Sequence, residues 1–314
     1  MRLIAALLFV VVTLPAQAQY PDRAVRIVVP FPAGGPTDIL TRVVAQQVAA
    51  RWSHPVVVDN KPGAGGAIGA DLVAKSPPDG YVLLMGTSST HSVGPALQKL
   101  PYDTEKDFTP LVNVGAAANV LIVSPSLEAS DVRSLIALAK AKPGELNYAS
   151  SGNGTVTHLS GELFKLLAGV DLQHVPYKGT GPAIPDIARG QVALIFDSII
   201  TGLQHAKSGN VRILAVCTEQ RSSLLPDVPT MAQAGLPGYE SSAWFGLFGP
   251  AAMAPAVVAK INADVAAALN VPDVRERFAA AGAETVGGTP QAFAGRIRAE
   301  REKWTRVVEA AGIR

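Results

Sequence analysis

Short runs of aliphatic residues alternate with segments of helical periodicity along most of the chain. The runs are continuous rather than interrupted by polar residues, which is typical of strands covered on both faces in a parallel sheet. This alternation favours an α/β fold in which crossovers between parallel strands are right-handed. The predicted strands are Val25–Val29, Pro55–Val58, Tyr81–Met85, Val120–Val123, Leu146–Ala149, Gln173–Tyr177, Val192–Phe196 and Val211–Val216.

Apolar residues three or four positions apart predict the helices that follow these strands. Ser130 is the predicted N-cap of one of them, and Gly169 is predicted to end another in a left-handed conformation. The predicted helical stretches include Ile39–Val48, Leu135–Ala139 and Leu159–Leu167, and near the end of the chain Pro255–Asn270, Asp273–Ala281 and Pro290–Ala311.

The first 18 residues have the pattern of a secretory signal peptide. Arg2 supplies a positive charge, an apolar run extends from Leu3 to Leu14, and the small residues Ala16 and Ala18 follow. The run is too short to span a membrane, which takes about 20 residues. We therefore expect cleavage after Ala18 and export of the mature chain.

The charge balance and the few cysteine and histidine residues exclude several classes of function. Lys and Arg number 27 against 25 Asp and Glu, so no basic stripe is predicted and nucleic acid is not an expected partner. The single cysteine cannot form an internal disulfide, and the five histidines do not cluster in the sequence. We predict no metal or other cofactor.

Two glycine-rich loops stand in the same local context, one in each half of the chain. Residues 30–38 and 150–158 each lie between a predicted strand and the first turn of a predicted helix. Glycine lets backbone amides approach a ligand closely, and a helix N-terminus presents free N–H groups. Either loop alone could be an ordinary tight turn. Together they predict two arms that hold an anion.

A set of motifs distributed over the mature chain resembles the tripartite tricarboxylate transporter receptors, also called the Bug family. The resemblance rests on Tyr20-Pro21-Asp22-Arg23, Val29-Pro30-Phe31-Pro32-Ala33-Gly34-Gly35-Pro36-Thr37-Asp38, Val56-Val57-Val58-Asp59-Asn60-Lys61-Pro62-Gly63-Ala64-Gly65-Gly66, Pro78-Asp79-Gly80-Tyr81, Leu100-Pro101-Tyr102-Asp103, Asp107-Phe108-Thr109-Pro110, Asn147-Tyr148-Ala149-Ser150-Ser151-Gly152, His174-Val175-Pro176-Tyr177-Lys178-Gly179, Leu225-Pro226-Asp227-Val228-Pro229-Thr230, Trp244–Pro250 and Glu300–Trp304. It implies a two-lobe periplasmic binding-protein fold with two crossover strands, each lobe a mainly parallel sheet flanked by helices. It also implies a small carboxylate ligand: a di- or tricarboxylate, an acidic amino acid or an aromatic acid.

The loops and the resemblance together indicate a set of ligand-binding residues. Asp38 has two interpretations, as a cap of loop amides or as a ligand contact, and His158 either donates to the ligand or is satisfied within its loop. Asp197 is expected at the cleft, where it would orient the opposite loop or an ammonium group. The predicted set is Phe31, Ala33, Gly34, Gly35, Asp38, Ser150, Gly152, Gly154, Thr155, His158, Tyr177 and Asp197.

We expect a monomeric periplasmic receptor. Its predicted first lobe comprises residues 19–120 and 226–314, and its second lobe residues 121–225. Val120–Val123 and Leu214–Val216 are the predicted crossings. The expected partner is a membrane permease, and the alternative is a membrane sensor that reads the liganded state. The chain has neither a G-x-S-x-G nor an H-E-x-x-H motif, which argues against an enzyme.

Overall fold

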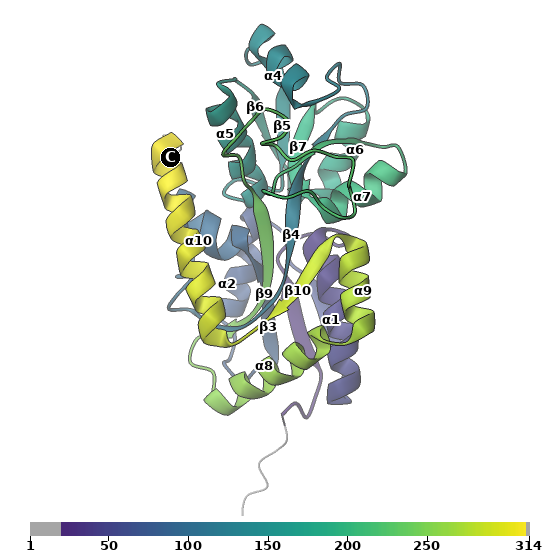
Figure 1. Ribbon diagram of the computed structural model, residues 1–314. Helices are drawn as coiled ribbons and strands as arrows, with labels where there is room; N and C mark the ends of the chain where they lie inside the picture. Colours follow the sequence, from purple (N-terminus) through teal and green to yellow (C-terminus); the bar gives the residue numbers. More distant parts are fainter. Residues whose placement is uncertain (1–19, 312–314) are drawn as a thin grey trace, which may run out of the picture.

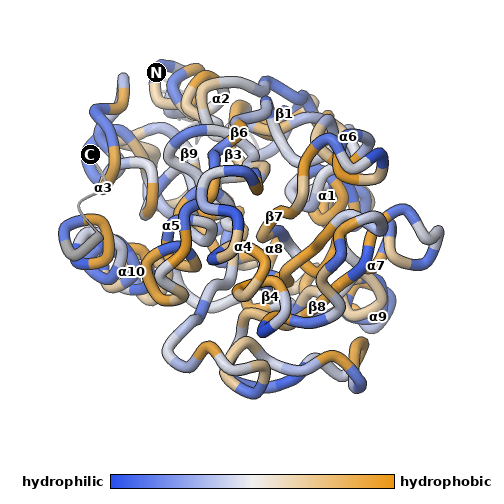
Figure 2. Tube along the Cα trace, turned by 90° about the horizontal axis from the view of Figure 1, so that it is seen from above, coloured by the Kyte–Doolittle hydropathy of each residue, from blue (hydrophilic) through white to orange (hydrophobic). Residues whose placement is uncertain are grey.

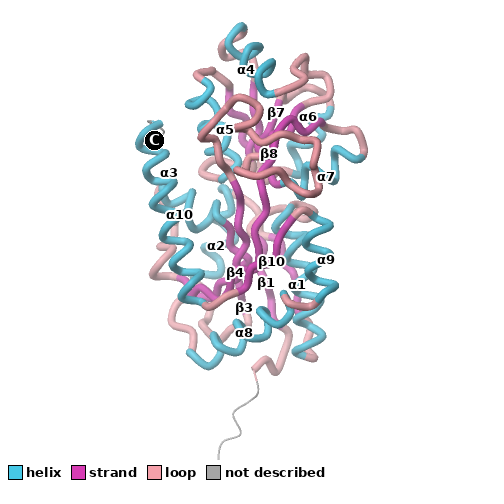
Figure 3. The backbone as a smooth tube through the Cα atoms, viewed as in Figure 1, coloured by secondary structure: helices cyan, strands magenta, loops and turns pink. Residues whose placement is uncertain are grey.

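The computed structural model describes residues 20–311, so the predicted signal peptide lies outside the described residues. A ten-stranded sheet runs through them. Figure 1 and Figure 3 show the strands as a band that continues from one half of the molecule into the other, with helices on both sides. This arrangement confirms the predicted α/β class and its two lobes.

The strands match most of the predicted ranges to within two residues, and so do the last three predicted helices. The first three predicted helices each begin three residues earlier than predicted. The strands are β1 (Val25–Val29), β2 (Val56–Asn60), β3 (Val82–Thr87), β4 (Phe108–Val123), β5 (Asn147–Ser150), β6 (Gln173–Pro176), β7 (Leu194–Ser198), β8 (Arg212–Val216), β9 (Ser242–Pro250) and β10 (Ala283–Gly287). The α-helices are α1 (Pro36–Trp52), α2 (Ala67–Ala74), α3 (Gly94–Leu97), α4 (Val132–Ala141), α5 (Val156–Ala168), α6 (Ile184–Ala188), α7 (Ile199–Lys207), α8 (Pro255–Leu269), α9 (Pro272–Ala281) and α10 (Pro290–Ala311). The short helical turns are η1 (Ala64–Gly66), η2 (Ser89–Val93) and η3 (Gly181–Ala183).

Parallel pairing is found within each lobe and antiparallel pairing where the chain crosses between them. In the first lobe β1 pairs in parallel with β2 and β3, and in the second β5 pairs in parallel with β6 and β7. Strand β9 lies antiparallel between β3 and β4, while β7, β8 and β10 pair antiparallel with β4. The sheet is therefore more mixed than the aliphatic runs predicted.

Strand β4 belongs to both lobes. Its 16 residues pair with β9 over Phe108–Ala118 and then with β7 over Asn119–Val123. The sequence predicted only Val120–Val123, because Pro110, Asn113 and Gly115 interrupt the aliphatic pattern of the first half.

The segment that follows residue 225, the predicted end of the second lobe, packs against residues of that lobe. Met231, Leu236 and Tyr239 are buried in the same cluster as residues of β7 and α5. The return to the first lobe follows at Ser241, whose N–H donates to the carbonyl of Cys217 at 2.7 Å. We propose from this packing that the second lobe ends near Ser242, so that β8 lies within it and the returning crossing is the start of β9.

Helices cover both faces of the sheet because their apolar residues face the strands. Figure 2 shows hydrophobic stretches along β4 and β8, and alternating colours along α10. In the first lobe, the indole of Trp244 packs edge-on against Phe293 from α10, with ring centres 5.2 Å apart. Further along α10, Trp304 packs in one cluster with Val156 and Leu159 of α5, so this helix contacts both lobes.

Helix ends follow the predicted chemistry with one shift. Gly169 ends α5 in the left-handed conformation at φ 62°, as predicted. The N-cap of α4 is Asp131 rather than Ser130: its carboxylate accepts from the Ser134 N–H at 2.7 Å, and the Ser134 hydroxyl accepts from the Asp131 N–H at 3.0 Å. Serine and aspartate are both favoured N-caps, and here they are adjacent. The sequence prediction therefore chose Ser130, one residue too early.

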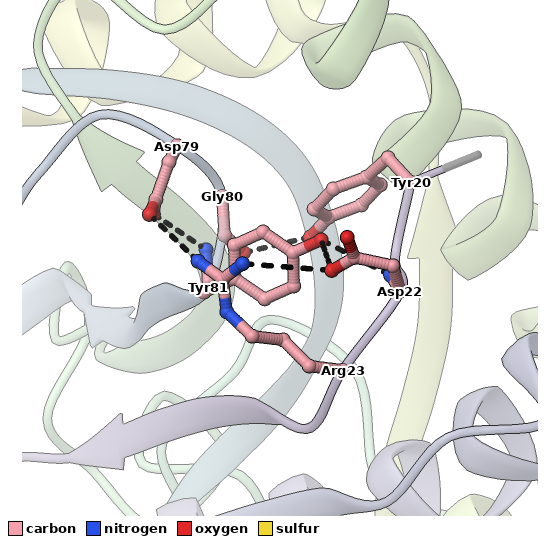
Figure 4. Close-up of polar contacts among 6 residues, drawn as sticks. All are labelled: Tyr20, Asp22, Arg23, Asp79, Gly80 and Tyr81. Atoms are coloured by element: carbon pink, nitrogen blue, oxygen red, sulfur yellow. Dashed lines mark hydrogen bonds and ion pairs between the residues drawn. The ribbon is translucent and has the colours of Figure 1, made fainter. Parts of the chain in front are cut away.

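The first described residues are fixed to the start of β3 by a polar cluster (Figure 4). The Tyr20 hydroxyl donates to the Gly80 carbonyl at 2.7 Å, and the Tyr81 hydroxyl donates to Asp22 at 2.6 Å. The Arg23 guanidinium lies 3.6 Å from the centre of the Tyr81 ring and pairs with Asp79. Two of the family-like motifs thus contact each other and hold the beginning of β1.

Candidate functional site

A cavity lies between the two lobes, at the ends of strands from both. Its volume is about 60 Å³. The first lobe contributes the loop before α1 and the segment after β3, and the second contributes the starts of α5, η3 and α7. The lining residues are Phe31, Pro32, Gly35, Pro36, Thr37, Thr87, Ser88, Ser89, Asn119, Ser151, Val156, Thr157, Thr180, Gly181, Asp197, Ser198, Ala243 and Phe245.

The first glycine-rich loop brings Phe31 and Gly35 to the cavity. Gly35 caps α1 in an extended conformation and Pro36 occupies the first helical position. The first turn of a helix has N–H groups without partners inside the helix, and here that turn begins at the cavity wall. Ala33 and Gly34 are not among the lining residues.

Asp38 is buried behind this loop, with 3% of its surface exposed. Its carboxylate accepts from the Gly34 N–H at 2.9 Å, from Arg42 at 2.9 Å and from the Asn60 amide at 3.0 Å. Burial raises the pKa of Asp38, but these hydrogen bonds outweigh burial and hold the pKa below its ordinary value. Of its two interpretations, the contacts favour the cap of loop amides.

We expect Asp38→Asn to lower the free energy of unfolding by about 2 kcal/mol at pH 7, because hydrogen bonds to a charged group are lost. A carboxyl whose pKa is lowered by folding stabilises the protein above its ordinary pKa and loses that contribution as the pH falls through the folded value. The deficit measured by urea unfolding should therefore shrink at pH 3. The exposed Asp227→Asn is the control, and an equal deficit at both pH values would contradict the role assigned to the charge.

The second glycine-rich loop is held by contacts among its own residues. The Ser150 hydroxyl lies 2.6 Å from Nε2 of His174 and accepts from the Gly152 N–H at 3.1 Å. The Thr155 hydroxyl donates to the Gly152 carbonyl at 2.7 Å and caps α5. The neighbouring Ser151 and Thr157 line the cavity in their place.

The predicted residues Gly154, His158 and Tyr177 contact groups away from the cavity lining. His158 stacks on His174 with ring centres 4.0 Å apart and accepts from the Gly154 N–H. Burial lowers the pKa of His174 to about 4, so this histidine is neutral at pH 7. The Tyr177 hydroxyl donates to Asp186 at 2.6 Å. Of the twelve predicted residues, Phe31, Gly35 and Asp197 line the cavity.

The lobes contact each other at the cavity rim. The Val156 N–H donates to the Ser89 hydroxyl across the lobes at 3.0 Å. A Cβ atom at Gly65 would lie 2.6 Å from the carbonyl oxygen of Asn153, and one at Gly179 would lie 2.4 Å from Cδ of Pro32. The two lobes therefore already meet at the rim of the cavity.

The cavity wall is rich in hydroxyl groups and poor in charge. None of the described residues that line it is Lys, Arg or His, and Asp197 is its single ionisable side chain. Within residues 20–311, Asp197 Oδ2, Thr87 Oγ1 and Ser88 Oγ are buried without a hydrogen-bond partner. Burial raises the pKa of Asp197 to about 6.

The described part of the chain has no group of three His, Cys, Asp or Glu residues placed to hold a metal ion. Among its helices, none is long and apolar enough to cross a membrane.

Comparison with known proteins shows to which family the chain belongs. The family model described as "Tripartite tricarboxylate transporter family receptor" matches residues 40–313. The chain belongs to this receptor family. It is 40% identical over 297 residues to Protein BugT of Bordetella pertussis, covering 94% of this chain and 91% of that protein.

Solved structures similar to this receptor include two with a bound acid. The structure described as R. palustris Rpa4515 with adipate is 38% identical with a TM-score of 0.91, covering 94% of this chain and 99% of that one. MatC from Rhodopseudomonas palustris with bound malate is 35% identical with a TM-score of 0.88, covering 92% and 100%. These neighbours confirm the two-lobe binding-protein fold.

The receptor's sequence carried a signal for part of the lining that the prediction missed. Thr87, Ser88 and Ser89 follow the buried strand β3 directly, as a run of hydroxyl residues. Polar residues at the end of a buried strand are candidates for a site. Asn119 and Phe245 had no such signal, because each becomes part of the wall only through the crossing of β4 and β9.

Proposed function

We propose that this receptor captures a small organic carboxylate between its lobes and delivers it to a membrane permease of the tripartite tricarboxylate type. The observation that carries the proposal is the hydroxyl-lined cavity between the lobes, to which both lobes contribute. Membership in the receptor family, and neighbours whose structures hold adipate and malate, support a carboxylate as the cargo.

Two helix N-termini supply the attraction for an anion. Helix α1 has 17 residues and α5 has 13, and both begin with residues of the cavity wall. Each helix N-terminus carries a partial positive charge of roughly half a unit. In α5 the N–H groups of Val156 and His158 already donate to the hydroxyls of Ser89 and Thr155, so this helix attracts the anion mainly through its partial charge. Hydrogen bonds from backbone N–H groups and from hydroxyls to a carboxylate are charge-assisted, at roughly 1.5–3 kcal/mol each.

The location of the receptor and its delivery step are part of the same proposal. Removal of residues 1–18 after export would leave the mature chain in the periplasm, where a monomer presents its closed lobes to the permease. A binding role of this kind needs no chemical step and no cofactor.

We expect adipate or malate to raise the melting temperature, and the corresponding diamide to leave it unchanged. An amide oxygen is a weaker acceptor and carries no net charge for the helix N-termini. An acid present at 100 times its Kd stabilises the folded state by about 2.7 kcal/mol, which shifts melting by several degrees. Differential scanning fluorimetry of the mature chain measures this, and mass spectrometry of protein purified natively identifies any retained acid. Equal shifts for acid and amide would contradict the proposal.

A further inference from the structure

Asp197 is the one acidic group in the cavity wall, and its environment limits what a ligand can place beside it. It lies near the end of β7 with 3% of its surface exposed, opposite Val120 of β4. Within the described residues its Oδ2 has no hydrogen-bond partner. A buried polar atom of this kind is costly unless a bound molecule satisfies it.

The groups around Asp197 do not include a compensating cation. The hydroxyls of Thr180 and Thr201 and the Ser198 N–H favour its charged form, while burial disfavours it more strongly and raises its pKa to about 6. Helix α7 also carries His205, and α5 carries His158 and Glu162. Burial lowers the pKa of both histidines, and for His158 the nearby Glu162 raises the pKa while Lys165 lowers it.

An ionised ligand carboxylate cannot be placed beside an ionised Asp197 at low cost. Two like charges in a buried site repel, and one of them then takes up a proton. A hydroxyl or ammonium group of the ligand does not repel the ionised Asp197. It donates a hydrogen bond to Oδ2, and no proton has to be taken up from solution. The orphaned hydroxyls of Thr87 and Ser88, from the other lobe, remain free to donate to a carboxylate.

We propose that Asp197 is a specificity-determining residue: it selects acids that present a hydrogen-bond donor to Oδ2, so that a plain dicarboxylate binds only with one additional proton. This inference rests on the proposed function and narrows its ligand class. The ligand carboxylate lies at the hydroxyls and helix N-termini, and its donor group faces Asp197.

Malate and succinate are the matched probes, since they differ by one hydroxyl group. Binding is measured by calorimetry at pH 6.5 and pH 8.0, where ionisation of the free acids is essentially complete. For the wild type, succinate affinity should fall by close to tenfold per pH unit, as expected for uptake of one proton. Malate affinity should change less than threefold, because its hydroxyl satisfies Oδ2.

Asp197→Asn tests the residue itself, and the exposed Asp171→Asn is the matched control. The asparagine amide donates to a carboxylate without a proton, so succinate affinity should become independent of pH in this variant and stay pH-dependent in the control. Circular dichroism and urea unfolding verify that both variants are folded. If a variant does not fold, the pH dependence of malate and succinate binding to the wild type still tests the proposal.

The outcomes separate this inference from the proposed function. Binding of both acids with a flat pH profile, or the same profile in Asp197→Asn and Asp171→Asn, would overturn the role of Asp197 and leave carboxylate capture intact. No binding of either acid to the wild type at either pH would overturn both.

Discussion

Replacing Gly152 with valine is expected to weaken ligand binding by roughly 30-fold or more while both lobes remain folded. Gly152 has φ +133°, which strains any residue with a side chain, and this strain is present whether the lobes are open or closed. Its Cβ would also lie 3.3 Å from the backbone of Gly65 in the other lobe. That second contact exists only when the lobes meet, so about 2 kcal/mol of its cost appears as lost affinity.

Gly169→Val separates the two effects. Gly169 has φ +62° in the same lobe, but nothing lies within 4 Å of a Cβ at this position. The control variant should therefore lose stability and keep its affinity. Affinity is measured by calorimetry with an acid that binds the wild type, and folding by circular dichroism. Equal affinities of the two variants would mean that the rim contact does not contribute to closure.

Trp244→Ala is expected to have the largest effect on stability, a loss of about 3–5 kcal/mol in the free energy of unfolding. Trp244 is fully buried among Phe248 and Phe293, and its indole N–H donates to Glu300. Burial already raises the pKa of Glu300, so the loss of this donor leaves a buried carboxyl with fewer partners. Urea unfolding at pH 7 measures the change.

Val286→Ala is the control, because this side chain is 48% exposed and its truncation should cost less than about 0.5 kcal/mol. Trp244 does not line the cavity, whereas its neighbours Ala243 and Phe245 do. Affinity of the folded variant should therefore change little. A stability loss below 1 kcal/mol would contradict the packing role of Trp244.

The sequence predicted those elements whose signal is local. The strands β1 and β3 and the helices α8, α9 and α10 have continuous aliphatic runs or clear periodicity, and their predicted bounds agree within two residues. Strand β9 was recognised only as a family-like segment, and β10 was not predicted. Their glycines and alternating small residues weaken the pattern, and pairing with β4 supplies the stability that the local sequence lacks.

The sequence predicted the two loops of the candidate site, but not which of their side chains line the cavity. The glycine-rich patterns correctly located the strand ends and helix starts that approach the cavity. Which side chain of each loop faces the cavity depends on the internal hydrogen bonds of that loop. Ser150 and Thr155 bind their own loop, and Ser151 and Thr157 take the wall positions. A sequence does not show this choice between neighbouring hydroxyls.

The position of β9 in the sheet has a consequence for how the chain acquires its structure. Strand β9 is inserted between β3 and β4, although about 120 residues separate it from β4 in the sequence. A chain synthesised only as far as residue 241 would hold the whole second lobe, but both β3 and β4 would expose unpaired backbone edges. Such edges template association between chains. Any product shortened before β9 should therefore aggregate rather than form a smaller binding domain, and the last quarter of the chain sets the pace of folding.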